Sequence, residues 1–321
     1  MKNRLFLNIR KTCARVADLA VSVKINRAFL DEYAASLPIE IALNTVMDTD
    51  NHFCDDSEAT LAYFLCLDSI NFGSGYFSQL DLEPGKNGYF TVASRLKNDF
   101  IRRGGYTANF LQQVTVQECC EIFRQNPANC TAFELMTFFT QAWRDLGNLL
   151  VQEFSGNWVN LIKSANCSAS TLAEILLRMP FYRDYFPYCG EEVLLLKRAQ
   201  ITASDLNIAF SGRGFGFFED IEELTIFADN LVPHVLRTDG LLSYCKELSD
   251  AISSGQILRS GSNEEIELRA CAIHAVELLR ETFASRGISV TSQGLDYLLW
   301  NRGQSRTYDL APTHTTRCVY Y

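Results

Sequence analysis

The 321-residue sequence lacks the features that mark membrane, secreted and nucleic-acid-coating proteins. No apolar run approaches the roughly 18 uncharged residues that a membrane-spanning helix needs. Arg and Lys interrupt the N-terminal segment every few positions, so it does not form the apolar part of a signal peptide. The net charge of −9 argues against a protein that coats nucleic acid. We therefore expect a cytoplasmic protein that neither enters a membrane nor binds nucleic acid directly.

Groups of metal ligands are also missing. Only four histidines occur, and the 11 cysteines include no CxxC pair. Most cysteines stand in apolar helical segments, as Cys66 and Cys271 do, where we expect small core residues of a reducing compartment. The glycine cluster at 211–218 has neither the lysine nor the Ser/Thr of a P-loop, and no GxSxG nucleophile motif is present. The sequence therefore predicts no metal site, no P-loop and no serine hydrolase triad.

Strand-like alternation is scarce, and helical periodicity dominates the chain. Short strand candidates occur at residues 41–47, 88–94 and 317–321. Helical patterns are clearest at 14–36, 59–70, 131–163 (broken at Gly156), 191–200, 219–228 and 266–287 (ended by Gly287). No Pro/Gly/Ser-rich linker, low-complexity run or internal repeat divides the chain. We predict an all-α fold, with at most short minor strands, in a single domain over residues 1–321.

Helix starts are marked by polar side chains that can accept backbone hydrogen bonds. Residues 55–57 (Asp-Asp-Ser) supply such acceptors before the apolar helix at 59–70. Capping boxes are predicted at 115–118 and 171–174, each with Thr at the first position and Glu at the fourth.

The most unusual carboxylate is Asp229, which follows the apolar residues of the predicted helix at 219–228. Pro233 comes four residues later and ends that helix or starts another one. One interpretation is that Asp229 caps the helix entered around Pro233. The other is that it serves a ligand, because a charge among apolar residues needs a partner.

Two further residues are candidates for ligand contacts. Asp296 precedes Tyr297 near the start of a predicted helix, where it could simply favour the helix dipole. Its two oxygens could also accept hydrogen bonds from the ring N–H and the amine of a guanine-like base, while an aromatic ring stacks on that base. His52 lies in a polar loop before a helix, and loop residues often carry function.

Segments along most of the chain resemble the queuosine salvage family of nucleotide N-glycosylases. The similar segments are LDSINFGSGYF at 67–77, LLLKRAQI at 194–201, DIEELTIFADNLVPHVLR at 220–237, EIELRACAIHAVELL at 265–279, LDYLLWN at 295–301 and HTTRCVYY at 314–321. Their order and approximate spacing agree with the family from end to end.

The resemblance implies a helical fold similar to that of helix-hairpin-helix DNA glycosylases, with no metal or organic cofactor. It implies hydrolysis of queuosine 5'-monophosphate to queuine, a base used in tRNA modification, and ribose 5-phosphate. The 7-deaza base has no N7 to protonate, so more of the catalysis must come from stabilising positive charge on the sugar. A carboxylate near the anomeric carbon suits that task. By family motif this carboxylate is Asp229, as electrostatic stabiliser, nucleophile or orienter of water.

The same resemblance implies the substrate-binding residues. Phe227 would stack on the base, Asp296 and Tyr297 would bind its guanine-like edge, and His52 would contact the base or its cyclopentenediol. Phe72 would line the same cavity. Lys197 would bind the phosphate or a carboxylate, with Arg198 as the competing candidate and a structural ion pair as the alternative for both.

One departure from the family concerns substrate preference. Asn301 stands after LDYLLW where family members carry an acidic residue. Asn keeps an acceptor and adds donors but removes the charge that would bind the aminomethyl cation of the base. Alternative functions are therefore an N-glycosidase for another purine-like nucleotide and a non-catalytic protein that binds modified nucleotides.

Overall fold

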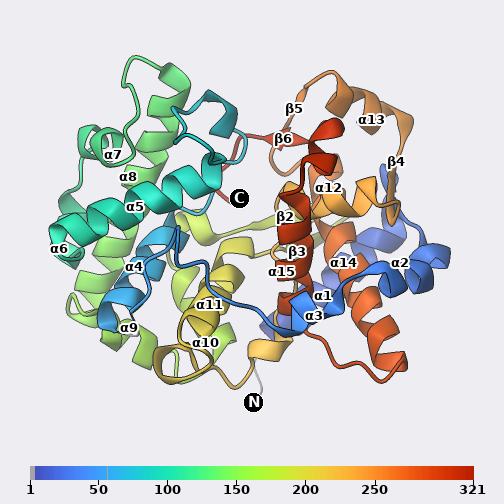
Figure 1. Ribbon diagram of the computed structural model, residues 1–321, viewed down its shortest axis with the longest axis horizontal. Helices are drawn as coiled ribbons and strands as arrows, with labels where there is room; N and C mark the ends of the chain where they lie inside the picture. Colours follow the sequence, from blue (N-terminus) through green and yellow to red (C-terminus); the bar gives the residue numbers. More distant parts are fainter. Residues whose placement is uncertain (1–3, 56) are drawn as a thin grey trace. The chain divides into compact units, whose positions relative to one another are not determined.

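The computed structural model describes residues 4–55 and 57–321, and these residues are mainly helical (Figure 1). The predicted all-α class with short minor strands is confirmed, whereas the similarity to helix-hairpin-helix glycosylases stays a prediction. The chain folds into two compact units. Unit 1 comprises the described residues up to Thr45 together with Asp184–Lys197 and Glu222–Arg317, and unit 2 comprises Val46–Arg183, Arg198–Ile221 and Cys318–Tyr321. That they act as one domain stays a prediction.

Unit 1 is built around the helix α14 (Asn263–Ser285), which is buried on all sides along most of its length. The helices that pack against it are α1 (Leu5–Leu19), α2 (Leu30–Ser36), α12 (Leu231–Thr238) and α15 (Ser292–Gly303). Ser262 caps its start by accepting the backbone N–H of Glu265 at 3.3 Å. Because neighbours cover this helix on every side, α14 forms the core of the unit, and its buried charged residues must find partners there.

The remaining elements of unit 1 are short. They are the helices α3 (Ile39–Leu43) and α13 (Lys246–Ser253), and the strand pairs β1 (Val23–Ile25) with β4 (Leu242–Tyr244), β2 (Tyr185–Tyr188) with β3 (Glu191–Leu194), and β5 (Ile257–Leu258) with β6 (Thr315–Thr316). The first two pairs are antiparallel and the third is parallel.

Unit 2 is built around α8 (Cys130–Phe154). Its neighbours are α4 (Glu58–Ser69), α6 (Ala108–Gln113), α7 (Val116–Ile122) and α9 (Trp158–Ser164). Gly147 lets α6 approach α8, because a Cβ at this position would lie 2.6 Å from the backbone nitrogen of Gln112. The unit also contains α5 (Gly88–Arg103), α10 (Ala169–Leu176) and α11 (Lys197–Ala209), whose first residue belongs to unit 1.

Several local predictions are confirmed because short-range interactions decide them. The pattern at 131–163 forms two helices separated at Ser155 and Gly156, both with positive φ. Ser57 caps α4 by accepting the N–H of Ala59 at 3.0 Å, whereas Asp56 lies outside the described residues. The capping box at 115–118 opens α7.

Other local predictions are wrong. The strand candidate at 88–94 lies in α5, the candidate at 41–47 begins in α3 and has no regular structure after Leu43, and β6 ends before residue 317. The helix predicted at 191–200 begins as strand β3, because Cys189 (φ +48°) and Gly190 (φ +85°) form a two-residue hairpin turn. The capping box at 171–174 is absent, since Ser168 caps α10.

The helix predicted at 14–36 is interrupted for a tertiary reason. The chain leaves α1 after Leu19 and forms β1 before it enters α2. The backbone N–H groups of Ser22 and Val23 donate to the Glu267 carboxylate of α14 at 2.6 and 3.1 Å. A side chain far along the sequence thus takes the hydrogen bonds that a continuous helix would have made internally.

Asp220 offers a test of stability that is separate from any ligand site. Its carboxylate accepts N–H bonds from Ala169 and Ser170 at 2.6 and 3.1 Å, at the start of α10. Burial alone would raise the pKa of Asp220, but these bonds and the hydroxyls of Ser170 and Ser168 lower it below its usual value.

We expect Asp220→Asn to lower the free energy of unfolding by about 1–2 kcal/mol at pH 7. Because the folded-state pKa is depressed, the carboxylate's contribution is complete above the unfolded pKa of about 3.9 and disappears as the pH falls through the folded pKa. Urea denaturation of both proteins at neutral and acidic pH measures this, and the difference between them should shrink in acid. Equal stability at pH 7 would contradict the assignment.

Candidate functional site

The segment that carries Phe227 and Asp229 is not helical. Residues 224–228 are buried but have no regular structure, and α12 begins only at Leu231, with Pro233 in its first turn. The helix predicted at 219–228 is therefore wrong. The physical reason is tertiary, because residues from two other helices take up the backbone groups of this segment. Arg269 of α14 donates Nε–H to the carbonyl of Ala228 at 2.9 Å, and Asp296 of α15 accepts the N–H of Phe227 at 2.9 Å.

Asp229 stands one residue before the N-cap position of α12, which is Asn230, and its side chain caps the first N–H groups of that helix, as one of its two interpretations predicted. Its Oδ1 accepts the N–H groups of Leu231 and Val232 at 2.7 and 3.2 Å. In the part of the chain that the structure describes, Oδ2 makes no hydrogen bond or ion pair, and the residue is only half-buried. The two interpretations are thus compatible. One oxygen fixes the carboxylate at the positive end of a helix, and the other is available to a ligand.

Asp296 and Phe227 are brought together inside unit 1. Both side chains are almost completely buried, with 6% and 5% of their surface exposed. The first turn of α15 contains no acidic residue, and Thr291 is its cap, so Asp296 does not serve the start of the helix. It instead holds the backbone N–H of Phe227. Tyr297, the next residue on α15, is half-buried.

Asn301 lies on the exposed side of the same helix. Its Nδ2 donates to the carbonyl of Tyr297, four residues earlier, at 2.7 Å. The Asn301 amide thus binds the backbone of its own helix, α15. A contact between Asn301 and the substrate stays a prediction.

Lys197 and Arg198 are adjacent but have different surroundings. Lys197 begins α11, is 5% exposed and donates its backbone N–H to Asp184 Oδ2 at 3.0 Å. Arg198 belongs to unit 2, where its guanidinium lies over the rings of Phe72 and Tyr182 and donates to backbone carbonyls. These contacts explain Arg198 as a residue of the core of unit 2. Lys197 stays the candidate for an anion by family resemblance, because the contacts of Arg198 place that guanidinium in the core of unit 2.

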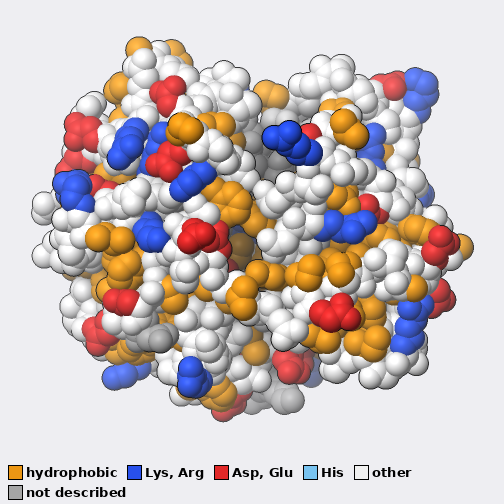
Figure 2. All heavy atoms as spheres, viewed as in Figure 1, with side chains coloured by type: hydrophobic (Ala, Val, Ile, Leu, Met, Phe, Trp, Pro, Cys, Tyr) orange, Lys and Arg blue, Asp and Glu red, His pale blue; other side chains and the backbone are white. Residues whose placement is uncertain are grey.

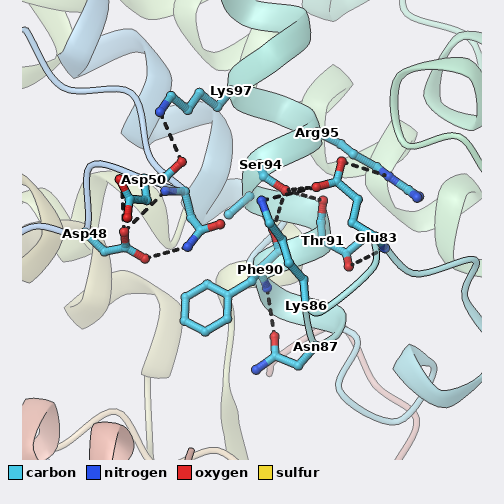
Figure 3. Close-up of polar contacts among 12 residues, drawn as sticks. Asp48, Asp50, Glu83, Lys86, Asn87, Phe90, Thr91, Ser94, Arg95 and Lys97 are labelled. Carbon is cyan, nitrogen blue, oxygen red and sulfur yellow. Dashed lines mark hydrogen bonds and ion pairs between the residues drawn. The ribbon is translucent and has the colours of Figure 1, made fainter.

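His52 is fixed from both sides within unit 2. Its Nδ1 lies 2.8 Å from the carbonyl of Asp48, and its Nε2 lies 2.9 Å from the hydroxyl of Tyr89 on α5. Burial lowers the pKa of His52 below its usual value, which favours the neutral ring. Figure 3 shows Lys97 of α5 reaching the turn that contains Asp48 and Asp50. The loop is therefore anchored on α5, and a contact of His52 with a base stays a prediction.

Phe72 lies in the core of unit 2. Its ring meets the edge of Phe139 at 5.2 Å between centroids, and the Arg198 guanidinium covers it at 4.7 Å. The backbone N–H of Gly73 donates to the carbonyl of Tyr321 at 3.0 Å. The contacts with Phe139 and Arg198 explain why Phe72 is buried. A role of Phe72 in lining a substrate cavity stays a prediction.

Two buried charged residues next to the Asp229 segment were not predicted. Arg269 and Asp184 pair with each other in unit 1, and their side chains are 0% and 3% exposed. Arg269 interrupts the apolar pattern of 265–279, and that irregularity could have indicated it. Asp184 has no comparable signal, because its neighbours in the sequence are polar and aromatic.

The described residues contain neither a metal site nor a membrane-spanning helix. Within residues 4–55 and 57–321, no three His, Cys, Asp or Glu side chains are arranged to hold a metal ion. No helix in these ranges has the length and apolar character needed to cross a membrane. A surface hollow of about 180 Å³ on unit 2 is lined by Arg95, Arg102, Arg103 and Arg124 with Asp99 and Glu121, and includes none of the predicted site residues.

Enzymes that hydrolyse glycosidic bonds use Asp or Glu carboxylates beside the bond that breaks, and Asp229 is the candidate for such a carboxylate in this chain. Residues 51–321 match the family model described as queuosine salvage protein. The chain belongs to this family. It is 33% identical to the Queuosine 5'-phosphate N-glycosylase/hydrolase of Sphaerobacter thermophilus over 98% of both chains. It is 31% identical to the Dictyostelium discoideum protein of that name over 98% of both chains, and 30% identical to that of Mus musculus over 82% of both.

Proposed function

We propose that this protein hydrolyses the N-glycosidic bond of queuosine 5'-monophosphate, releasing queuine and ribose 5-phosphate for salvage into tRNA modification. Full-length relatives bear the name of this enzyme activity. The observation that carries the proposal in this chain is Asp229, whose Oδ1 is fixed by two backbone N–H groups while Oδ2 is left without a hydrogen bond among the described residues.

In the proposed reaction the bond between C1' of the ribose and the base nitrogen breaks, and a water oxygen bonds to C1'. One water proton remains on the new hydroxyl, and the other balances the charge of the departing base. Positive charge develops on the sugar before the water bond is complete, so a negative oxygen held close to C1' stabilises the transition state more than the substrate. The geometry of Asp229 suits a stabiliser, a nucleophile or an orienter of water.

We assign base recognition to Asp296, Tyr297 and Phe227. The hydrogen bond from Phe227 to Asp296 links the aromatic wall to the carboxylate that would bind the guanine-like edge. We assign the anionic part of the substrate, its 5'-phosphate, to Lys197. The contacts of His52 and Phe72 follow from the family resemblance alone, and Asn301 would contact the substrate from the position where the family carries an acidic residue. The two units would act together as one glycosylase domain, without a metal or organic cofactor.

A small-molecule substrate is favoured over a nucleic acid by the charge of the chain. On the face drawn in Figure 2, Lys and Arg side chains are interspersed with Asp and Glu. The net charge of −9 adds to this argument, since backbone phosphates bind basic surfaces. We also propose that the protein is cytoplasmic.

The decisive experiment incubates the purified protein with queuosine 5'-monophosphate and follows free queuine by mass spectrometry. Parallel reactions contain guanosine monophosphate or free queuosine. We expect queuine from the first substrate at a far higher rate than guanine from guanosine monophosphate. Cleavage of another purine nucleotide instead would indicate an altered substrate, and tight binding without cleavage would indicate a non-catalytic nucleotide-binding protein.

A further inference from the structure

Arg269 and Asp184 form a two-point ion pair in the core of unit 1. Nη1 of Arg269 donates to Asp184 Oδ1 at 2.8 Å, and Nη2 donates to Oδ2 at 2.6 Å. This parallel arrangement fixes the orientation of both groups as well as their distance. Removing two charges from water is costly, so a buried pair is weak support for stability by itself and is better explained by what it holds in place.

The pair holds two chain segments that carry candidate site residues. Nη1 of Arg269 also donates to Glu265 Oε1 of the same helix at 3.2 Å, and Nε–H binds the carbonyl of Ala228, which directly precedes Asp229. Oδ2 of Asp184 accepts the backbone N–H of Lys197 at 3.0 Å. A continuous chain of hydrogen bonds therefore runs from the backbone beside Asp229, through the ion pair, to the backbone of Lys197.

The chain next to Lys197 is strained, which is an independent observation at the same place. Leu196 has φ of +52°, in the left-handed region that a leucine rarely adopts. The carbonyl of Asp184 accepts the N–H groups of Leu195 and Leu196 at 3.0 and 3.2 Å and so holds this conformation. Backbone strain that the surroundings enforce is concentrated at functional sites.

We propose that Arg269 and Asp184 are positioning residues, which set the placement of Asp229 relative to Lys197 for the hydrolysis of the glycosidic bond. The inference rests on the proposed function. Neither side chain touches the substrate. A displacement of about 1 Å at a reacting group can lower a rate by about 10²-fold, and the ion pair prevents such a displacement.

The test replaces Arg269 by Lys, which keeps the positive charge but cannot bind Asp184 at two points and Ala228 at once. We expect kcat to fall by about 10²-fold while KM changes little, because the loss concerns geometry in the transition state. Asp184→Asn is a second variant, in which the side chain keeps nearly the shape of aspartate but loses its charge. We expect the same fall in kcat with little change in KM. The matched control is Glu267→Gln, a buried carboxylate of the same helix that binds Ser22, Val23 and Tyr188, and its kcat should stay near that of the wild type.

Amide hydrogen exchange supplies a measurement that needs no activity. In Arg269→Lys the amides bound to Asp184 (Leu195, Leu196 and Lys197) and those bound to Asp229 (Leu231 and Val232) should exchange faster together, while the rest of unit 1 is unchanged. In Glu267→Gln only the amides of Ser22 and Val23 should respond. Faster exchange throughout unit 1 would show a merely structural role and overturn the proposal.

The positioning role of Arg269 and Asp184 would also be overturned if a folded Arg269→Lys protein had the kcat of the wild type. Unchanged exchange at the amides of Leu231 and Val232 would overturn it too. If the wild-type protein releases no queuine, the proposed function fails. The exchange comparison still decides whether the ion pair holds both segments, so the two failures can be told apart.

Discussion

Asp229→Asn is expected to lower kcat for queuine release by about 10³-fold with little change in KM. The amide retains one oxygen that can accept the N–H groups of Leu231 and Val232, so the start of α12 is preserved. What disappears is the negative charge of the carboxylate. Its attraction for the ribose grows only as positive charge develops there, and the loss therefore falls on the chemical step.

Single-turnover reactions followed by mass spectrometry measure the effect, and thermal unfolding shows whether the variant is folded. Asp220→Asn is the matched control, because it makes the same change at another helix-capping aspartate. That control should lose stability but not kcat. Full turnover by Asp229→Asn would exclude the catalytic assignment even if the substrate is correct. A mass increase of the wild-type chain by one ribose phosphate during turnover would identify Asp229 as a nucleophile.

Asp296→Ala is expected to raise KM for queuosine 5'-monophosphate by about 10- to 100-fold, the usual loss when a hydrogen bond to a charged group is removed from a buried site. The truncation has two consequences. It removes the carboxylate that would bind the guanine-like edge, and it leaves the N–H of Phe227 without its acceptor in the core. Both consequences weaken binding of the base.

Asp296→Asn separates the two consequences, since its oxygen can still accept the N–H of Phe227. If the charge binds the base, this variant should also raise KM, although its stability stays near that of the wild type. Initial rates over a range of substrate concentrations give KM, and Asp239→Asn is a matched control. Asp239 is a partly exposed aspartate of unit 1 that binds Tyr33, Tyr308 and Arg302, so its loss should affect stability and not KM. Unchanged KM in both Asp296 variants would remove Asp296 from the base site.

The fold class follows from the sequence because helical periodicity, caps and helix-ending glycines are local. The capping box at 115–118 and the break at Gly156 are found where the pattern indicates them. The errors occur where distant residues compete for the backbone. Glu267 ends the helical run before Ser22 and Val23, and Arg269 and Asp296 keep residues 224–228 from forming a helix.

For the candidate site too, some features follow from the sequence and others only from the tertiary structure. Residue type and family motif identified Asp229, Phe227, Asp296 and Lys197 as candidates, and their roles are proposals. The sequence left open whether Asp229 caps a helix or serves a ligand. The structure shows that Oδ1 of Asp229 caps α12 and Oδ2 does not. A sequence pattern cannot distinguish the two oxygens of one side chain.

By itself the sequence determined the helical class, the family and the identity of the candidate residues, because these depend on residue type, spacing and order. Only the tertiary structure decided which oxygen of Asp229 is open, that Asp296 holds Phe227, and that Arg269 and Asp184 join the segments of Asp229 and Lys197. The physical reason is that a buried backbone group must find a hydrogen-bond partner, and its partner can come from anywhere in the chain.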